Sequence, residues 1–347
     1  MPRTPAPLIG AFVVAATILL AAPALAADER LSFSHFMPVN SWQNETLFAD
    51  WARAVEDAAA GSGAELEITV FPAQMLGRAE RGYDNARDGI TDIAWTVPGY
   101  TPGRFPLAQI IELPGLFDRA EVGSCAFQKL YDSGALDAEF AEVRVLFVHT
   151  HGPGHLHTRN RAVTRLSDLA GLKIRRPSPV IGELLAELGA EPVGMPAPQI
   201  YEATSRGTID GYMLPWEAVA GFRLDEVSAH HTVFGFYSLA FLTVMSAERY
   251  AGLSAPLQAA IDAQSGMAWA RAAGRGFDAG DRRGLEVARA SGNLHEIAGE
   301  ERAAWEAAAA QVTENTLARM EASGLPARET YAAVQRYVSA CEAEIDG

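Results

Sequence analysis

Hydrophobic and polar positions along the chain follow two spacings that alternate from segment to segment. The segments ERLSFSHF (29–36) and ELEITVF (65–71) alternate apolar and polar residues, which predicts two half-buried strands. Between them, apolar residues over 48–55 recur every three or four positions, which predicts a helix. Another helical stretch leads to the buried strand in DGITDIAW (88–95). This β-α-β-α order is typical of an α/β fold with a largely parallel sheet.

The second half of the chain repeats the alternation. EVRVLFVHT (142–150) predicts a long strand that ends before Gly152-Pro153-Gly154. The strand LKIRR, the helix VIGELLAELGA, the strand EPVGM, a second helix and the strand TIDGYML follow, before the apolar run TVFGFYSLAFLTVM (232–245). After Ser246 the composition is typical of helices, with interruptions predicted near Gly274–Gly280 and Ser291-Gly292.

Two strand-rich crossings, near 148–155 and 232–245, divide these elements. They predict two α/β lobes joined by extended hinge strands; the alternative is one large sheet with a helical C-terminal domain. In an open α/β lobe, ligands lie beyond the carboxyl ends of the strands. Candidate site residues should therefore follow the strands directly.

The first 26 residues have the pattern of a secretory signal peptide. Arg3 precedes an apolar run over 8–22, and Ala24-Leu25-Ala26 offers a small-x-small site, so we expect cleavage after Ala26. The alternative is a membrane anchor, but the run is shorter than the ~20 residues that a spanning helix needs. We therefore expect an exported, periplasmic chain without a membrane anchor.

The chain is strongly acidic, with a formal net charge of −15. Such a charge argues against nucleic-acid and anionic-membrane partners. A small acidic ligand would be repelled at long range, so any acid-binding site must contain a local cation.

The two cysteines, Cys125 and Cys341, lie far apart in the sequence. In an exported protein they could form a disulfide, and the alternative is two buried thiols. The sequence leaves both open.

Enzyme motifs are scarce. The chain contains neither a G-x-S-x-G elbow nor a phosphate-binding G-x-x-x-x-G-K-[ST] loop. Four histidines in HTHGPGHLH, at 149, 151, 155 and 157, could bind a metal in an exported enzyme, but no H-E-x-x-H accompanies them. The alternative is that they bond to the backbone at the hinge while one or two line the cleft.

Arg175 and Arg176 end the strand LKIRR just before a proline. Neighbouring residues of a strand point to opposite faces, so the two arginines cannot share one role. A planar guanidinium can hold a carboxylate through two parallel hydrogen bonds, which lysine cannot match.

Tyr212, Trp216 and Glu217 follow the turn Asp210-Gly211 at another strand end. Aromatic rings with one acid would suit an organic ligand with an apolar body and a hydroxyl or amine. The alternative is a set of core aromatics with a capping glutamate.

Several motifs in a characteristic order resemble one family. They are LSFSHFMP, VFPAQMLG (70–77), DGITDIAW (88–95), ELPGLF (112–117), DLAGLKIR (168–175), LGAEPVGMP (188–196) and GTIDG (207–211). Over nearly all of the mature chain, the sequence resembles the DctP-like periplasmic solute-binding proteins of tripartite ATP-independent periplasmic (TRAP) transporters.

The resemblance implies a receptor, with no cofactor and no catalysis. It would bind an organic acid between two lobes and deliver it to the TRAP membrane permease. Lobe I would comprise 27–150 plus about 238–278, and lobe II about 151–237 plus 279–347 with bridging C-terminal helices. We expect a monomer. A binding protein of an ATP-driven importer is the alternative within this fold.

The resemblance also implies site residues. The arginine that ends the GLKIR motif, Arg175, would hold the carboxylate, while Arg176 would lie at the rim or surface. Two departures concern Gly154 and His155, where many members carry a second arginine, and Tyr212, Trp216 and Glu217, which replace a common Glu-Asn-Pro step.

These departures favour a monocarboxylate with an aromatic, apolar or hydroxylated body, and a small dicarboxylate fits less well. The alternative is a dicarboxylate, keto-acid or sugar-acid receptor of the same system. For the opposing wall, candidates in the first lobe are Phe36, Asn40, Trp95, Tyr100 and Arg104. For Arg104, a structural role in holding its loop is favoured over ligand binding.

Overall fold

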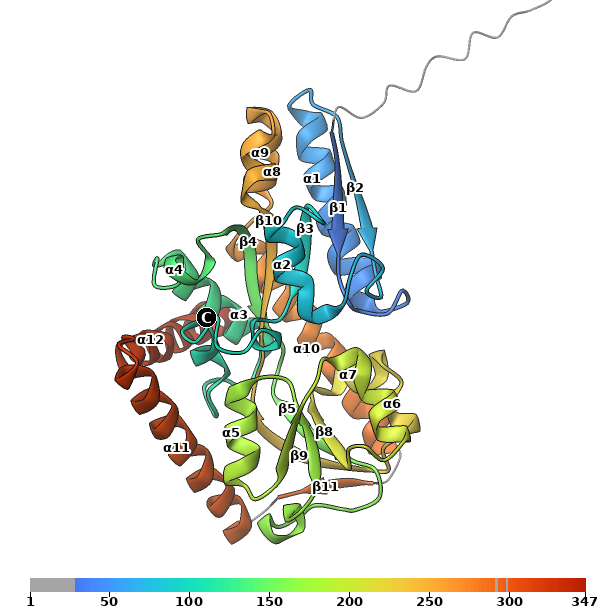
Figure 1. The fold of residues 1–347 in the computed structure, drawn as a ribbon, viewed down its shortest axis with the longest axis vertical. Coiled ribbons are helices and arrows are strands. Elements are labelled where there is room, and N and C mark those ends of the chain that lie inside the picture. The colour runs from blue at the N-terminus through green and yellow to red at the C-terminus, as the bar shows by residue number, and fades with distance from the viewer. Residues whose placement is uncertain (1–28, 291–292, 298) are drawn as a thin grey trace, which may run out of the picture.

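The computed structural model describes residues 29–290, 293–297 and 299–347. The predicted signal peptide and its cleavage site lie outside these residues, as does the break predicted at Ser291-Gly292. Within the described part of the chain, none of the helices has the length and apolar character needed to cross a membrane. Two β-sheets with helices around them form two lobes, one above the other in Figure 1.

The first sheet has the strand order β2-β1-β3-β10-β4. The strands are β1 (Glu29–Ser34), β2 (Leu66–Phe71), β3 (Ile93–Thr96), β4 (Val143–Thr150) and β10 (Ala240–Ser246). β1 pairs in parallel with β2 and β3, but β10 is antiparallel to both of its neighbours. The sheet is thus mixed and not largely parallel, because β10 enters it from the other lobe.

Helices cover this sheet and bury its apolar residues. They are α1 (Ala49–Gly61), α2 (Gly82–Arg87), α3 (Ala120–Asp132), α4 (Asp137–Phe140), α8 (Ala247–Gly252) and α9 (Ala255–Ala263). Phe33 of β1 packs edge-on against Phe48 and Trp51, and all three side chains are fully buried. The apolar spacing over 48–55 therefore predicted the correct face of α1.

The second sheet has the order β11-β9-β5-β8-β6-β7. Its strands are β5 (Gly154–Thr158), β6 (Lys173–Arg176), β7 (Glu191–Gly194), β8 (Gly211–Leu214), β9 (His230–Tyr237) and β11 (Leu294–Glu296). Its helices are α5 (Pro179–Glu187), α6 (Ile200–Ser205) and α7 (Trp216–Gly221). β6 is parallel to β7 and β8, so the carboxyl ends of these three strands meet at one edge.

The chain crosses between the sheets at 151–153 and at 238–239, close to the predicted hinges. The two-lobe α/β fold is confirmed, and a single large sheet is excluded.

Helix α10 (Met267–Ala290) runs continuously from one lobe to the other. A break at Gly274–Gly280 was therefore a wrong prediction. Its glycines are contact points: a Cβ at Gly274 would lie 2.5 Å from the Glu121 Cα, and one at Gly284 would lie 2.4 Å from the Trp216 carbonyl oxygen. Close packing, and not helix termination, explains these glycines.

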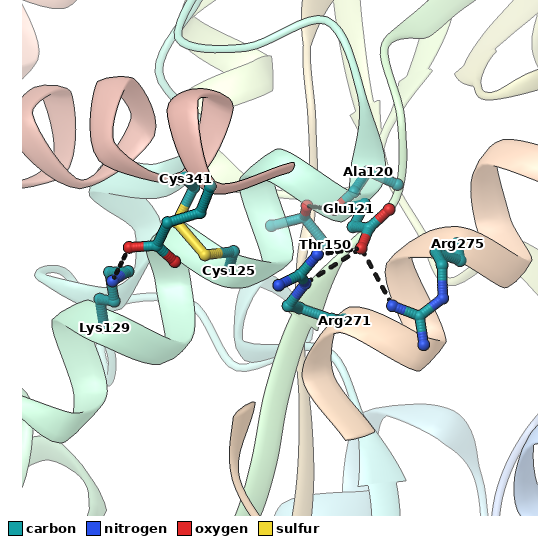
Figure 2. The surroundings of a disulfide bond; sticks show 9 residues. Ala120, Glu121, Cys125, Lys129, Thr150, Arg271, Arg275 and Cys341 are labelled. Atoms are coloured by element: carbon teal, nitrogen blue, oxygen red, sulfur yellow. Dashed lines mark hydrogen bonds and ion pairs between the residues drawn. A yellow bond between two sulfur atoms is a disulfide. The ribbon is translucent and has the colours of Figure 1, made fainter. Parts of the chain in front are cut away.

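The two last helices belong to different lobes. α11 (Gly299–Ala322) packs on α5, but α12 (Ala327–Asp346) returns to α3 of the first lobe (Figure 1). The prediction gave 279–347 to lobe II with bridging C-terminal helices, and α12 is the helix that reaches the first lobe. There the disulfide Cys125–Cys341 joins α3 to α12 with a Cα–Cα distance of 6.0 Å and lies beside the ion pair of Lys129 with Glu344 (Figure 2).

Candidate functional site

A narrow, largely filled cavity lies between the lobes at the hinge. The space in it that is open to a water-sized sphere is about 20 Å³, so a ligand could enter only after the lobes or the side chains move apart. One side of the cavity is formed by the first lobe and α10, and the other side by the strand ends of the second lobe. Its walls are made by Phe36, Met37, Trp95, Tyr100, His151, Arg175, Ala197, Leu214, Pro215, Glu217, Ala218, Phe222, Leu239, Phe241 and Phe277. Strand ends form much of this wall, as expected for a ligand site in α/β lobes.

Arg175 is the cation of this cavity, and its side chain is only 1% exposed. Its Nε donates to the Met195 carbonyl at 2.8 Å, and Nη1 donates to the Met213 carbonyl at 3.0 Å. Nη2 lies 3.4 Å from the Tyr100 hydroxyl. No carboxylate in the described residues forms an ion pair with it, although burying an unpaired charge is costly. Burial lowers the pKa of Arg175 from its ordinary value.

Arg176 points to the other face of β6, as strand alternation predicted. Its side chain packs over Gly182 of α5 and Gly194 of β7, where added Cβ atoms would lie 2.3 and 3.0 Å from it. The two arginines therefore have different environments.

Aromatic rings cover most of the apolar wall. Trp95 is stacked on Phe241 with ring centroids 4.7 Å apart and an interplanar angle of 4°, and Phe36 lies 4.6 Å from Trp95 on a tilted plane. The Trp95 Nε1 donates to His149 Nε2 at 2.8 Å, which fixes the indole ring. A flat apolar ligand would find rigid ring faces here.

Tyr100 and Glu217 join the two lobes at the cavity. The Tyr100 hydroxyl, from the first lobe, accepts from the Ala197 N–H of the second at 3.1 Å. Glu217, at the start of α7, accepts from Gln43 Nε2 at 2.8 Å and from Trp42 Nε1 at 3.3 Å across the same boundary. Burial raises the pKa of Glu217 to about 7, although both hydrogen bonds lower it.

The Glu217→Gln variant should remove one component of the pH dependence of stability. The folded state holds the Glu217 proton up to about pH 7, whereas the unfolded state releases it near 4.5, so wild-type stability falls as pH rises between these values. Glutamine keeps an acceptor oxygen but does not titrate. Denaturant unfolding at pH 5, 6, 7 and 8 should show the wild type losing roughly 1–3 kcal/mol relative to the variant. Parallel pH profiles would contradict this role of Glu217.

The cavity brings together half of the ten predicted ligand-binding residues. These five are Phe36, Trp95, Tyr100, Arg175 and Glu217.

Three other predicted residues belong to the body of the second lobe. Trp216 stacks on His155 with ring centroids 4.5 Å apart and lines a different, open groove on this lobe. His155 accepts from the Phe234 N–H at 3.2 Å. Tyr212 is buried in a core cluster, where its hydroxyl bonds to Ser228 at 2.7 Å. Each was predicted from its place near a strand end, but their rings fill the space between secondary-structure elements.

Two predicted residues of the first lobe also lie outside the cavity. Asn40 is exposed and lines a neighbouring surface hollow beside Glu217. Arg104 forms ion pairs with Asp84 and Glu142 and lies over the Tyr83 ring, which is the structural role given as its alternative.

Residues after the second crossing and on α10 were missed. Leu239 and Phe241 flank that crossing, while Phe277 comes from the middle of α10. The predicted hinge position could have pointed to the first two, but nothing in the local sequence placed Phe277 against Phe241. His151 belongs to the histidine group of which one or two members could line the cleft, and it forms part of the cavity wall.

The histidines at 149, 155 and 157 are engaged separately. His157 Nδ1 lies 2.8 Å from His231 Nδ1, and its Nε2 lies 3.1 Å from the Leu214 carbonyl oxygen. Among the residues that the structure describes, only Cys125, Cys341 and Glu344 form a group of three with metal-ligand spacing, and its two sulfurs are in the disulfide. A metal centre built on the histidine cluster has no support in this geometry.

A larger groove on the second lobe, lined by Trp216, Arg223 and His231, is open to solvent. Its Arg223 is already paired with Glu226. The interlobe cavity is the better candidate because its cation, Arg175, is buried and has no acidic partner among the described residues.

Two α/β lobes closed over a cavity at their hinge define a two-lobe solute-binding protein. A family model described as DctP, bacterial extracellular solute-binding protein, family 7, matches residues 33–320. The chain belongs to this family, the periplasmic solute receptors of TRAP transporters. The resemblance drawn from the motifs is confirmed.

Solved structures share the fold. A TRAP solute binding protein from Rhodoferax ferrireducens, in complex with copurified benzoate, is 34% identical with a TM-score of 0.86, over 92% of this chain and 100% of that chain. A marine metagenome TRAP solute binding protein specific for aromatic acid ligands, in complex with metahydroxyphenylacetate, is 33% identical with a TM-score of 0.85, over 90% and 99%.

A curated relative has another kind of ligand in its name. The 2,3-diketo-L-gulonate-binding periplasmic protein YiaO of Escherichia coli is 27% identical over 199 residues, which are 57% of this chain and 61% of the relative. Family membership alone therefore does not define the ligand.

Proposed function

We propose that the chain binds an aromatic monocarboxylate in the interlobe cavity and delivers it to a TRAP membrane permease. The observation that carries this proposal is the buried Arg175 guanidinium, which has no acidic partner among the described residues and faces a cavity walled by aromatic rings. The protein acts as a monomeric periplasmic receptor and performs no catalysis.

Arg175 and Tyr100 hold the carboxylate. A guanidinium has five N–H donors, and the contacts to Met195, Met213 and Tyr100 occupy three of them. Two donors are left for a carboxylate oxygen. The Tyr100 hydroxyl accepts from the Ala197 N–H, so its own proton is a further donor. Burial raises the pKa of Tyr100, which keeps that proton in place.

The ligand body is an aromatic ring. Trp95, Phe36 and Phe241 offer ring faces and edges against which another ring packs with favourable offset or edge-to-face geometry. A sugar acid would bring several hydroxyl groups into this wall, and most would lose their hydrogen bonds to water without replacement. The two relatives with bound aromatic acids support this choice over the keto sugar acid named for the E. coli relative.

Ligand binding favours the closed lobes. The carboxylate contacts Arg175 of the second lobe and Tyr100 of the first, so the ligand has more contacts in the closed state than in an open one. A ligand shifts a conformational equilibrium by its difference in affinity for the two states. The permease can then distinguish the ligand-bound receptor by its closed conformation.

A ligand panel tests the proposal directly. The melting temperature of the wild type should rise by about 4 °C with benzoate, phenylacetate or one of their hydroxylated forms at 100 times Kd. Galacturonate and succinate at the same concentration serve as sugar-acid and dicarboxylate controls. A larger shift with either control than with every aromatic acid would overturn the aromatic assignment while leaving a solute receptor.

A further inference from the structure

His151 lies at the first hinge crossing, next to the proposed carboxylate site. Its side chain is 2% exposed and forms part of the cavity wall that contains Arg175. Its Nδ1 contacts the carbonyl oxygen of Gly152. The other ring nitrogen, Nε2, is buried and has no hydrogen-bond partner among the described residues. Buried polar atoms without partners are uncommon in folded proteins.

The tautomer of this imidazole follows from its backbone contact. A carbonyl oxygen can only accept, so the Nδ1 that contacts Gly152 carries the hydrogen and Nε2 presents a lone pair. Burial lowers the pKa of His151 to about 4, and the positive charge of Arg175 contributes to this shift. The ring is therefore neutral near pH 7. Nε2 is therefore an acceptor that requires a donor.

The position of that acceptor is well defined. The His151 ring lies edge-on against Tyr237, with centroids 5.5 Å apart and an interplanar angle of 87°, and is tilted against Phe241 at 5.9 Å. The backbone of His151 is held by Ser238, whose hydroxyl donates to its carbonyl oxygen at 2.6 Å. Packing from both hinge segments thus holds the imidazole ring in place beside the cavity.

We infer that His151 determines specificity by accepting a hydrogen bond from a hydroxyl group on the bound aromatic acid. The preferred ligand is then a hydroxylated aromatic monocarboxylate, in which the carboxylate contacts Arg175 and the hydroxyl contacts His151. This inference rests on the proposed function, since it assumes an aromatic acid in the cavity. An unsubstituted ring would leave the Nε2 lone pair desolvated and unpaired, and such groups strongly reject ligands that lack the matching donor.

Calorimetry with matched ligands tests this role without relying on a variant. Each monohydroxybenzoate is compared with the fluorobenzoate of the same substitution, since fluorine is close to hydroxyl in size but donates no hydrogen bond; benzoate is the common reference. For the wild type, at least one hydroxy isomer should bind about tenfold more tightly than its fluoro counterpart. Hydroxy and fluoro isomers of equal affinity would overturn the inference, while tight benzoate binding would leave the proposed function intact.

Two variants assign the preference to His151. In His151→Phe the tenfold preference should fall to about twofold or less, because the ring shape is kept and the acceptor is lost. In His151→Gln a side-chain oxygen remains within reach as an acceptor. This variant should still bind the hydroxy isomer at least about threefold more tightly than the fluoro isomer. A preference that persists in His151→Phe would overturn the inference, and wild-type protein that binds none of these acids would overturn the proposed function together with it. Unfolding curves without ligand confirm that both variants are folded.

Discussion

Replacing Arg175 with alanine should weaken binding of the aromatic acid by at least about 100-fold. A carboxylate in the closed cavity of this variant would be removed from water and left without its cation, which costs roughly 3–5 kcal/mol. The guanidinium is buried and has no acidic partner in the described chain, so its removal leaves no protein charge unpaired. The variant does leave the Met195 and Met213 carbonyls without this donor, so unfolding curves without ligand check that it is folded, and calorimetry measures the affinity directly.

The neighbouring Arg176→Ala variant is a matched control. It removes an identical charge one residue away, but from the opposite face of β6, where the side chain packs on Gly182 and Gly194. Its affinity should stay within about threefold of the wild type. If Arg175→Ala kept wild-type affinity, or if both variants lost affinity equally, the carboxylate would not be held at Arg175.

Removing the disulfide should produce the largest loss of stability. The double variant Cys125→Ala, Cys341→Ala opens a cross-link between positions 216 residues apart, and the chain-entropy model gives a loss of about 5 kcal/mol for such a loop. The melting temperature should fall by about 8 °C. Both cysteines are fully buried between α3 and α12, away from the cavity, so ligand affinity should change by no more than about twofold.

A nearby ion pair provides the control for this prediction. Lys129 and Glu344 connect the same two helices at the surface (Figure 2), and Lys129→Ala should cost less than about 1 kcal/mol. Thiol labelling under denaturing conditions measures the cross-link itself. Two reactive thiols in the freshly purified wild type, or equal stability of wild type and double variant, would contradict the expected role of the disulfide.

Much of the fold could be predicted from local patterns. Strand alternation and the strand-helix order predicted the two lobes and both hinges, because burial of one face imposes a regular spacing on the sequence. Alternation on β6 also predicted that Arg175 and Arg176 have different environments, but the choice of Arg175 as the ligand-binding arginine came from the family motif. Apart from that choice, these inferences depend only on residues close together in the sequence.

The rest of the site depends on long-range contacts. Trp216 and Glu217 are neighbours at the start of α7, yet Glu217 faces the cavity while Trp216 lines another groove. Phe277 reaches the cavity from α10, a helix predicted to be broken because glycine is a poor helix former. Which side of a helix faces a site depends on partners that adjacent residues do not specify.

The glycines of α10 also affect how the protein folds. Gly274, Gly276, Gly280 and Gly284 each cost a helix about 1 kcal/mol relative to alanine, so this segment has a weak tendency to be helical by itself. In the folded protein, Glu121 and Trp42 of one lobe and Glu217 and Trp216 of the other pack closely against those glycines. We therefore expect the helix to need contacts from both lobes. The two lobes should therefore gain their full stability together, in one cooperative transition, although a cavity separates them.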